Sequence, residues 1–525
     1  MSTINVDNIN PASQSQVTIG PLNLTGTVET GTFTASAVLN VEVNGVPYKL
    51  LLAETTTPSN SFMFTVNTAI AGSSSNNQFT IPTTGIGYNY TVTTSEETLT
   101  NQTGNCTLTW ATPGTYSVEI TGDFPRIYFF NIGDKDKIIE VQRWGNIGWI
   151  SFENAFFGCS NLDITATDAP VLTNVNSMSN CFRSCSSLEN SNVSIGLWDV
   201  SNVTNMQGMF MSCINPSFSD DLSSWNVSNV TDMSYMFSNM NSFNSDISNW
   251  DVSSVTNMRN MFDSCNPFNQ DISNWNVSSV TDMQAMFATC LNFNSNIGGW
   301  TVSNVTNMNN MFNSSNFNQN IGGWDVSSVT DMQGMFQYND NFNQPIGNWN
   351  VSNVTNMRSM FGSPTFPVAF NQDISGWTVS NVTNMEGMFE NATSFNQDIS
   401  GWNVAQVTTM ERMFKNATSF NQYIGIWNTV NVANMESMFE NATSFNQQLD
   451  AWSLTNVNNM TNFMSGKSTS NYSYYDDLLI NFESTIAQSG VTLDMGTIQY
   501  TSTGATSRQN IIDNYSWTIN DGGQI

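Results

Sequence analysis

The chain has 525 residues with 12 basic side chains, 41 acidic side chains, no histidine and a formal net charge of −29 at pH 7. That charge repels phosphate backbones and anionic lipid headgroups, so nucleic acid and membrane surfaces are excluded as expected partners. The absence of histidine excludes Ser-His-Asp catalysis, Cys-His catalysis and His-ligated zinc. We expect no metal, no cofactor and no enzymatic activity.

Residues 1–57 are rich in Thr, Val and Asn, and the runs VLNVEVNGV and YKLLLAE predict strands around an Asn44-Gly45 turn. The opening INVDNINPASQSQVTIGPLNLTG, followed by VNGVPYKLLL, resembles the attachment ends of structural proteins from tailed phages, especially marine ones. The resemblance implies an anchor module that binds other virion proteins. The amino terminus shows no basic start and no apolar run, so a secretion signal is not expected.

Residues 58–122 predict a small β-sandwich, with strands at 62–66, 88–92 and 106–110. The segment ATPGTYSVEITG at 111–122 is similar to the last strand of polycystic-kidney-disease-type domains, in which a Pro-Gly turn precedes a Tyr-x-Val strand. The Trp-Gly-Asp-Gly turn usual in that family is replaced here by TVTTSEET. We therefore predict a second all-β module before the repeats.

From about residue 123 to 465 the chain repeats itself at intervals close to 25 residues, which is typical of a solenoid. The tryptophans that mark the repeat are Trp198, Trp225, Trp250, Trp275, Trp300, Trp324, Trp349, Trp377, Trp402, Trp427 and Trp452. In one unit the W-x-V alternation at Trp275 predicts a short strand with one face inward. Met283, Met286 and Phe287 then share one face of a predicted helix that begins at Thr281. Two further units read as helix capping boxes, Thr383 with Glu386 and Thr408 with Glu411.

Two polar or polarizable positions recur inside the repeat. An Asn follows a Phe in nine units, and we predict an internal amide ladder that satisfies backbone groups at a recurring bend. Its members are Asn244, Asn269, Asn294, Asn318, Asn343, Asn371, Asn396, Asn421 and Asn446. A row of ligand-binding amides is the alternative. Five of the seven cysteines share one register, which favours packed free thiols over disulfides. They are Cys159, Cys185, Cys213, Cys265 and Cys290.

The residue after each tryptophan forms a candidate ligand-facing stripe, because it points away from the buried ring on a strand. The stripe comprises Asn226, Asp251, Asn276, Thr301, Asp325, Asn350, Thr378, Asn403 and Asn428, with Ser453 after them. An exposed polar row of this kind suits hydrogen bonding to glycans, and it is equally what any exposed strand face requires.

Residues 466–525 break the period and predict a C-terminal cap, with a helix at 476–484, a strand at 491–493 and a second helix at 508–514. The NDGG at 520–523 predicts a turn, because it lacks the alternating acidic ligands of a calcium loop.

The repeat core W-[DN]-V-S-x-V-T-x-M-x-x-M-F with F-N-Q, the entry GDFPRIYF and the exit YDDLLINF to WTINDGG resemble the BspA-type leucine-rich-repeat surface proteins of bacteria. The resemblance covers residues 123–525. It implies an α/β solenoid, a right-handed leucine-rich-repeat-like coil with one short parallel strand and one short helix per unit, and adhesion to surfaces.

The leading hypothesis is a non-enzymatic component of a tailed-phage virion that displays a repeat rod at the virion surface, for host recognition or for decoration of the capsid or tail. Residues 1–57 would hold it in an oligomeric assembly, and a host surface glycan or protein would be its receptor. One alternative is a BspA-type adhesin on a bacterial cell surface. A polysaccharide-acting enzyme is another alternative, and the nearest carboxylate pairs for it are Glu386 with Glu390 and Glu436 with Glu440.

Overall fold

The computed structural model describes residues 38–43, 46–51, 60–189, 195–215 and 221–525. The chain divides into two compact units, Met1–Ser59 and Asn60–Ile525. In the first unit, β1 (Val38–Val43) pairs antiparallel with β2 (Val46–Leu51), and Val43 lies opposite Val46. The predicted hairpin is therefore confirmed. The remaining residues of the predicted anchor, with its turn at 44–45, lie outside the described part of the chain.

The second unit begins with a mixed sheet of six strands in the order β10-β9-β3-β8-β5-β6. These strands are β3 (Phe62–Asn67), β5 (Asn89–Thr93), β6 (Thr98–Gln102), β8 (Thr115–Asp123), β9 (Ile138–Arg143) and β10 (Asp163–Ile164). A separate pair, β4 (Gln78–Ile81) and β7 (Cys106–Thr109), packs an alternating apolar face against it. The predicted strands at 62–66, 88–92 and 106–110 are confirmed. Because β9 pairs with β3, one sheet contains strands from both sides of residue 122.

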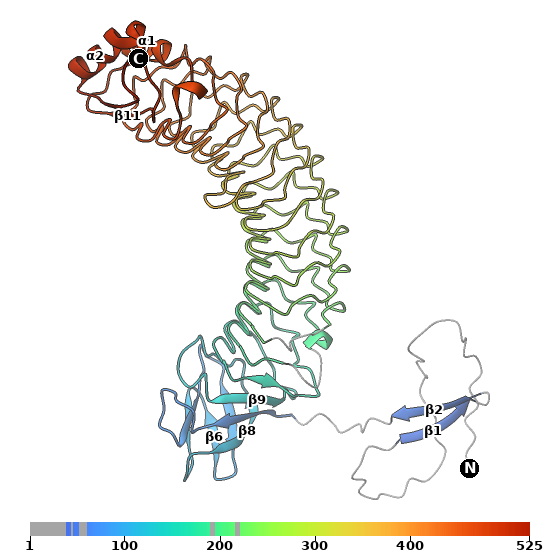
Figure 1. Ribbon diagram of the computed structural model, residues 1–525. Coiled ribbons are helices and arrows are strands. Elements are labelled where there is room, and N and C mark those ends of the chain that lie inside the picture. The colour runs from blue at the N-terminus through green and yellow to red at the C-terminus, as the bar shows by residue number, and fades with distance from the viewer. Residues whose placement is uncertain (1–37, 44–45, 52–59, 190–194, 216–220) are drawn as a thin grey trace, which may run out of the picture. The chain divides into compact units, whose positions relative to one another are not determined.

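After β10 the chain winds through successive units that lie side by side (Figure 1). We call the described residues between 150 and 467 the repeat column. Neighbouring units are joined by single parallel bridges, one residue per unit, as from Asn257 to Asp282 and from Asp282 to Asn307. These bridges link Ser177 through to Asn459, so a narrow parallel seam replaces a continuous sheet along the described units.

The predicted fold class, an α/β solenoid of the leucine-rich-repeat type with a strand and a helix in each unit, is wrong. Residues 221–466 consist of turns and bridges and hold neither a strand nor a helix. The helix fails because Ala285, two residues after the first Met, has φ of 52°, and the equivalent position is left-handed throughout the column. Its N–H donates to Asn309 in the next unit at 2.8 Å, while Met286 N–H makes a local turn to Met283 at 3.2 Å. Alternate amides therefore point along the column instead of closing helical rings.

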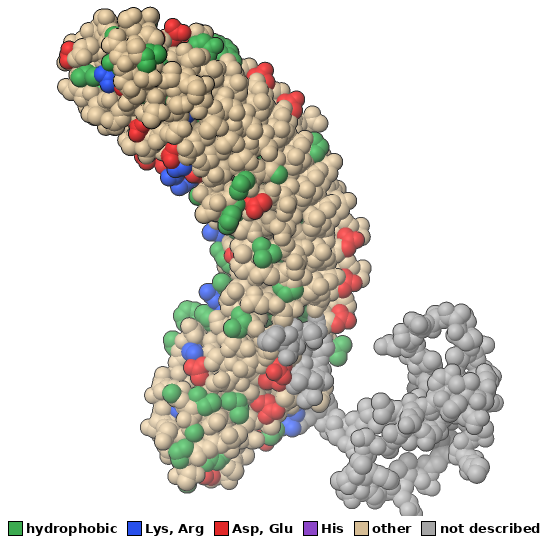
Figure 2. Space-filling model, viewed as in Figure 1, with side chains coloured by type: hydrophobic (Ala, Val, Ile, Leu, Met, Phe, Trp, Pro, Cys, Tyr) green, Lys and Arg blue, Asp and Glu red, His purple; other side chains and the backbone are tan. Residues whose placement is uncertain are grey.

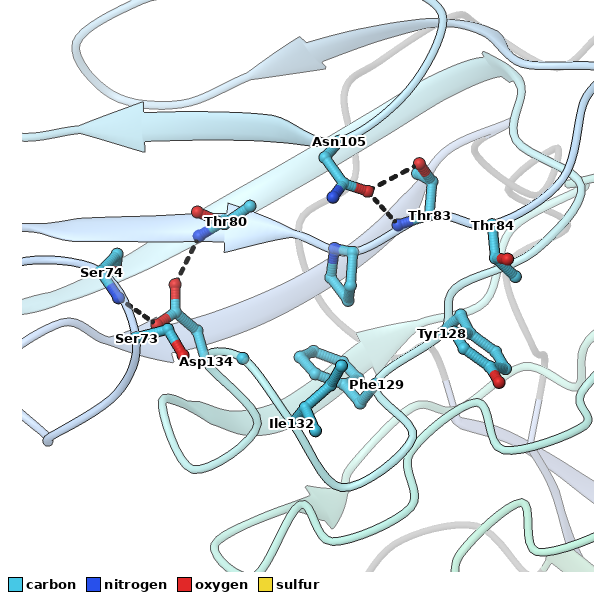
Figure 3. Close-up of a pocket in the computed structure, with 12 residues that line it drawn as sticks. Ser73, Ser74, Thr80, Thr83, Thr84, Asn105, Tyr128, Phe129, Ile132 and Asp134 are labelled. Atoms are coloured by element: carbon cyan, nitrogen blue, oxygen red, sulfur yellow. Dashed lines mark hydrogen bonds between the residues drawn. The ribbon is translucent and has the colours of Figure 1, made fainter.

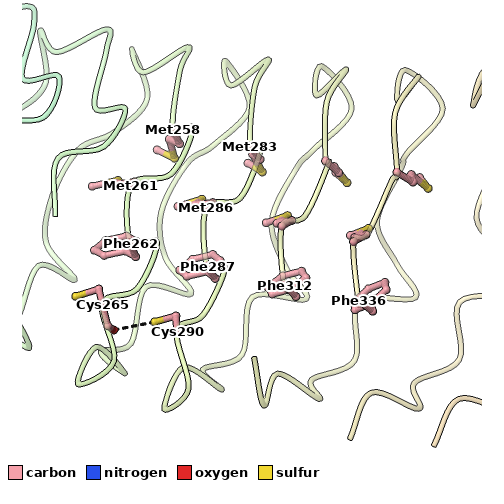
Figure 4. Packing of buried hydrophobic residues seen from close by; sticks show 14 of the residues in the cluster. Met258, Met261, Phe262, Cys265, Met283, Met286, Phe287, Cys290, Phe312 and Phe336 are labelled. Atoms are coloured by element: carbon pink, nitrogen blue, oxygen red, sulfur yellow. Dashed lines mark hydrogen bonds between the residues drawn. The ribbon is translucent and has the colours of Figure 1, made fainter. Parts of the chain in front are cut away.

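The apolar positions that suggested a helix nevertheless form the core. Figure 4 shows Met, Phe and Cys side chains of neighbouring units stacked in register. The first Met, the second Met and the following Phe are almost fully buried in unit after unit, as Met283, Met286 and Phe287 illustrate. Their burial in a continuous cluster is the main stabilising term, because one unit alone leaves this face exposed.

The tryptophans form a second buried row, and its spacing explains the bend of the column in Figure 1. Ring centroids along the Trp row lie 6.3 to 6.5 Å apart. Centroids along the Phe row that follows the second Met lie 5.7 to 6.0 Å apart. The column therefore curves toward its Met–Phe side.

Buried donors hold successive units at this spacing. From Trp225 to Trp452, each indole N–H of the row donates to a backbone carbonyl of the preceding unit, as from Trp324 to Ile297 at 3.1 Å. The cysteine register acts in the same way, since the Cys290 thiol donates to the Cys265 carbonyl at 3.0 Å (Figure 4). All seven cysteines are free and buried. Asn339 and Lys467 occupy the same register and donate to the equivalent carbonyls.

The C-terminal residues close the last unit. Helix α1 (Tyr475–Thr485), strand β11 (Thr492–Asp494), helix α2 (Ser502–Tyr515) and strand β12 (Thr518–Asn520) match the predicted helix, strand and helix. The short 3₁₀ helices η1 (Ile195–Leu197) and η2 (Thr469–Asn471) lie near the two ends of the column. Asp476 accepts from the Thr501 backbone at 2.9 Å and so holds α1 against the start of α2. None of the described helices is long and apolar enough to span a membrane.

Candidate functional site

The predicted stripe lies at the surface, but most of its side chains are engaged in their own turns. All nine residues are exposed. Seven of them accept a hydrogen bond from the backbone N–H two residues later, as Asp325 does from Ser327 at 3.1 Å and Asn276 from Ser278 at 3.2 Å. Thr301 and Thr378 make no such bond. Most stripe side chains therefore stabilise their own turns, and a role for the stripe in ligand binding stays a prediction.

The same turn hydrogen bond also lowers the pKa of the aspartates in the stripe. The Ser253 hydroxyl and backbone N–H lower the pKa of Asp251, and Ser327 does the same for Asp325. Both carboxylates therefore stay ionised to a lower pH than an ordinary aspartate does. An equivalent serine also lowers the pKa of the aspartates that lie four residues before a Trp, namely Asp246, Asp271 and Asp398.

The predicted amide ladder is confirmed in its bonding and wrong in its position. The Asn269 side-chain oxygen accepts from the Asn294 backbone N–H at 3.0 Å, and Asn294 accepts from Asn318 at 2.9 Å. The pattern continues to Asn446, which accepts from Ser473. The ladder residues are exposed or half-buried rather than internal, because the bend that they bridge lies at the rim of each unit.

A different surface gathers the charges of the column. We call this surface the Met–Phe strip. In each unit it comprises four positions: the residue that forms the bridge, the two residues after the first Met, and the residue after the Phe. In the unit of Met283 these are Asp282, Gln284, Ala285 and Ala288. The basic residues of the described column, except for buried Lys467, all fall on it: Arg183, Arg259, Arg358, Arg412 and Lys415. Figure 2 shows Lys and Arg along one edge of the column and only Asp and Glu along the other.

Toward its C-terminal half the strip carries a paired cluster. Glu386 binds Arg358 at 3.0 Å and Arg412 at 2.6 Å, and Lys415 binds Glu440 at 2.9 Å. Burial raises the pKa of Glu390 nearby, although Arg412 and Lys415 act to lower it. The expected capping boxes are therefore wrong: Glu386 holds two guanidinium groups, and Thr408 donates to the Thr383 carbonyl of the preceding unit at 3.1 Å. Among the described residues no group of His, Cys, Asp or Glu forms a metal site.

The β-module of the second unit contains a cavity of about 370 Å³ (Figure 3). Phe129 and Ile132 form its apolar wall, and Thr83 and Asn105, joined by a hydrogen bond of 2.8 Å, lie on the polar side. Asp134 at its rim accepts from the Ser74 and Thr80 backbones at 2.9 and 2.7 Å, so this carboxylate orders the loop.

A buried ammonium lies beside that cavity. Lys137 is fully buried and donates to the carbonyls of Ser74, Ser75 and Gln78 at 2.8 to 3.0 Å, with Asp134 at 3.8 Å. Burial lowers the pKa of Lys137, whereas Asp134 acts to raise it. The oxygens around Lys137 are satisfied by its own side chain, so this cluster is structural.

One comparison with known proteins identifies the repeats. A family model described as Mycoplasma protein of unknown function, DUF285, matches residues 150–253, 214–316, 290–368 and 363–476, which together exceed half of the chain. The chain belongs to the DUF285 family. DUF285 repeats are of the BspA-like kind, so this part of the resemblance is confirmed. No curated protein and no solved structure matches the chain.

The DUF285 match supports neither a leucine-rich-repeat fold nor a phage origin. It also leaves the activity open, because the function of the family is unknown. The Met–Phe strip was missed at the sequence level, although a signal was present: apart from Lys467, the basic residues of the matched repeats all lie within two residues of a repeat methionine or directly after the repeat Phe.

Proposed function

We propose that this chain is a non-enzymatic display and adhesion protein, in which a β-rich N-terminal module anchors the chain and the repeat column binds a surface receptor. The observation that carries the proposal is the regular exposure of the same side-chain rows on a column locked by bridges, indole donors and amide ladders. Such a scaffold presents many equivalent contacts, which suits binding to a repetitive surface.

We further propose that the assembly is the virion of a tailed phage, at the capsid or the tail, with residues 1–57 binding other virion proteins. The support is the resemblance of the opening segment to phage attachment ends. A bacterial cell-surface adhesin is the second candidate, and membership in DUF285, whose description names Mycoplasma proteins, favours it.

Co-sedimentation separates the two candidates. If the chain is a virion protein, it pellets with purified particles, and deletion of residues 1–57 removes it from them while the second unit, Asn60–Ile525, keeps its melting temperature. Recovery of the chain in washed bacterial envelopes and not in particles would support the adhesin. The adhesion proposal itself is tested by binding of the purified full chain to intact cells of candidate hosts; no binding to any surface would contradict it.

A further inference from the structure

The N-terminal end of the Met–Phe strip differs from its C-terminal end in the pairing of its charges. Among the described side chains, eight basic residues lie within 4 Å of a carboxylate: Arg126, Lys135, Lys137, Arg143, Arg358, Arg412, Lys415 and Arg508. Arg183 and Arg259 do not, and both are half-buried. In a chain with a net charge of −29, two uncompensated guanidinium groups on one short stretch of surface form a local exception to its overall anion repulsion.

A hollow of about 290 Å³ opens between these units, lined by Asn180, Arg183, Gln207, Met211 and Tyr235. Three successive units contribute to it, and the next unit brings Arg259, whose carbonyl accepts from the Tyr235 N–H at 2.8 Å. The Arg183 guanidinium lies 4.9 Å from the centre of the Phe157 ring and donates to the Asn180 side chain at 3.4 Å. The guanidinium is thus oriented by a ring and an amide while its charge stays unneutralised.

The acids of the same stretch are already engaged. Asp232 accepts from the Ser234 backbone at 2.8 Å and from the Asn257 amide at 3.3 Å. Asp263 accepts from Asn260 at 3.0 Å and from Ser264 at 3.1 Å. Among the described residues, no carboxylate lies within 4 Å of Arg183 or Arg259, and Asp232 and Asp263 are held in place by these neutral donors.

The other lining groups define the ligand. The Gln207 side-chain oxygen accepts from Ser179 at 3.4 Å, which leaves its amide N–H groups to donate outward, and the Tyr235 hydroxyl has no described partner. Met211 and the Tyr235 ring add apolar surface. An acidic sugar ring carries all the groups that this lining requires. Its carboxylate would pair with the guanidinium, its hydroxyls with the amide and the phenol, and its C–H groups with the apolar wall.

An acidic peptide fits less well, because the strip offers no free backbone edge. The Asn180 N–H donates to the Gln207 carbonyl at 2.7 Å and the Gly208 N–H to the Ser234 carbonyl at 2.8 Å, so an extended chain could not add a strand here. We infer that the hollow formed by Asn180, Arg183, Gln207, Met211 and Tyr235 binds the carboxylate-bearing ring of an acidic polysaccharide. This inference rests on the proposed adhesion function and assigns it a site.

The test uses the full chain with a galacturonic acid trimer and its methyl ester as probes, measured by isothermal titration calorimetry. The ester keeps the rings and removes the charges. We expect the acid to bind and the ester to bind at least tenfold more weakly. Arg183→Gln should weaken binding of the acid at least tenfold. Arg358→Gln, which removes the same charge from the paired end of the strip, should change it less than about twofold.

Equal binding of acid and ester, or undiminished binding by Arg183→Gln, would overturn the inference and leave the adhesion proposal standing. Absence of binding by either trimer would also overturn it, whereas the adhesion proposal fails only if the chain binds no cell surface. If Arg183→Gln lowers the melting temperature, Gln207→Ala replaces it as the test, because it keeps Arg183 and its Phe157 contact. Gln207→Ala should weaken binding of the acid at least tenfold, and undiminished binding would overturn the inference.

Discussion

The two long surfaces of the repeat column use similar polar residues for different purposes. On the Trp side, Asp325 and Asn276 turn back onto their own backbone and hold the bend that follows the tryptophan. On the Met–Phe strip, Arg183 donates one bond to Asn180 and Gln207 accepts one from Ser179, and their remaining N–H groups have no described acceptor. Exposure alone therefore does not identify a recognition surface; the decisive property is whether a side chain has hydrogen-bonding capacity left after the fold has been satisfied.

The Trp side should be the more costly one to damage. Trp324→Ala removes a buried ring and the indole bond to Ile297, and we expect a loss of about 3–5 kcal/mol in the free energy of unfolding, measured by urea denaturation. Trp324→Phe should cost less, because it retains most of the packing and leaves only a carbonyl unpaired. A variant as stable as the wild type would mean that the indole row does not hold the units together.

The buried ammonium of Lys467, which lies in the cysteine register at the C-terminal end of the column, should make the stability of the chain depend on pH. Burial lowers the pKa of Lys467 from 10.5 to about 8. Between these pH values the unfolded chain binds more protons at this site than the folded one, so stability should rise with pH across the window, by at most about 3 kcal/mol. The comparison is Lys467→Met, in which this rise should be missing from melting curves between pH 7.5 and 10.5. Parallel curves for the two proteins would contradict the prediction.

The amide ladder joins neighbouring units at the rim and should matter less. Asn294→Ala removes an acceptor for the Asn318 N–H, and a cost of about 1 kcal/mol is expected in urea denaturation. Asn294→Asp keeps the side-chain oxygen and serves as the matched control. If both variants lose the same stability, the ladder bond is not the cause.

The smallest effect is expected at the stripe. Asp325→Ala should cost about 0.5 kcal/mol at neutral pH through the loss of its turn bond. Asp325→Asn should be close to neutral, because Asn350 makes the equivalent turn bond in the next unit. The lowered pKa of Asp325 means that its contribution is present above the carboxyl's ordinary pKa and is lost as the pH falls through the folded value. Thr301→Lys and Thr378→Lys leave the turns intact, so they test the stripe for adhesion without a change in melting temperature.

Much of the architecture could be predicted from the sequence, and the failure has a clear cause. The period, the buried Trp, Met and Phe positions, the Asn244–Asn446 ladder bonds and the helices of the C-terminal cap follow from residue patterns. The helix expected after Thr281 does not form, because the same apolar spacing is met by turns with a left-handed residue at Ala285. Apolar periodicity reports which side chains are buried, and it does not report whether amides bond within a unit or to the next one.

The candidate site could be predicted only in part. Exposure of the stripe was predictable from its place after tryptophan, but its turn bonds depend on backbone geometry. The hollow around Arg183 is assembled from three units that are 28 and 27 residues apart, and the lack of an ion pair for Arg183 becomes evident only when its distances to the surrounding carboxylates are known.

Hydroxyl-radical footprinting of the full chain, with and without the galacturonic acid trimer, tests most directly whether recognition occurs on the Met–Phe strip. Met211 and Tyr235 report on the hollow, and Tyr423, which is 37% exposed on the Trp side, is the internal control. Protection of Met211 and Tyr235 with Tyr423 unchanged is the predicted result. Protection of Tyr423 with Met211 and Tyr235 still reactive would place recognition on the opposite side and contradict the account.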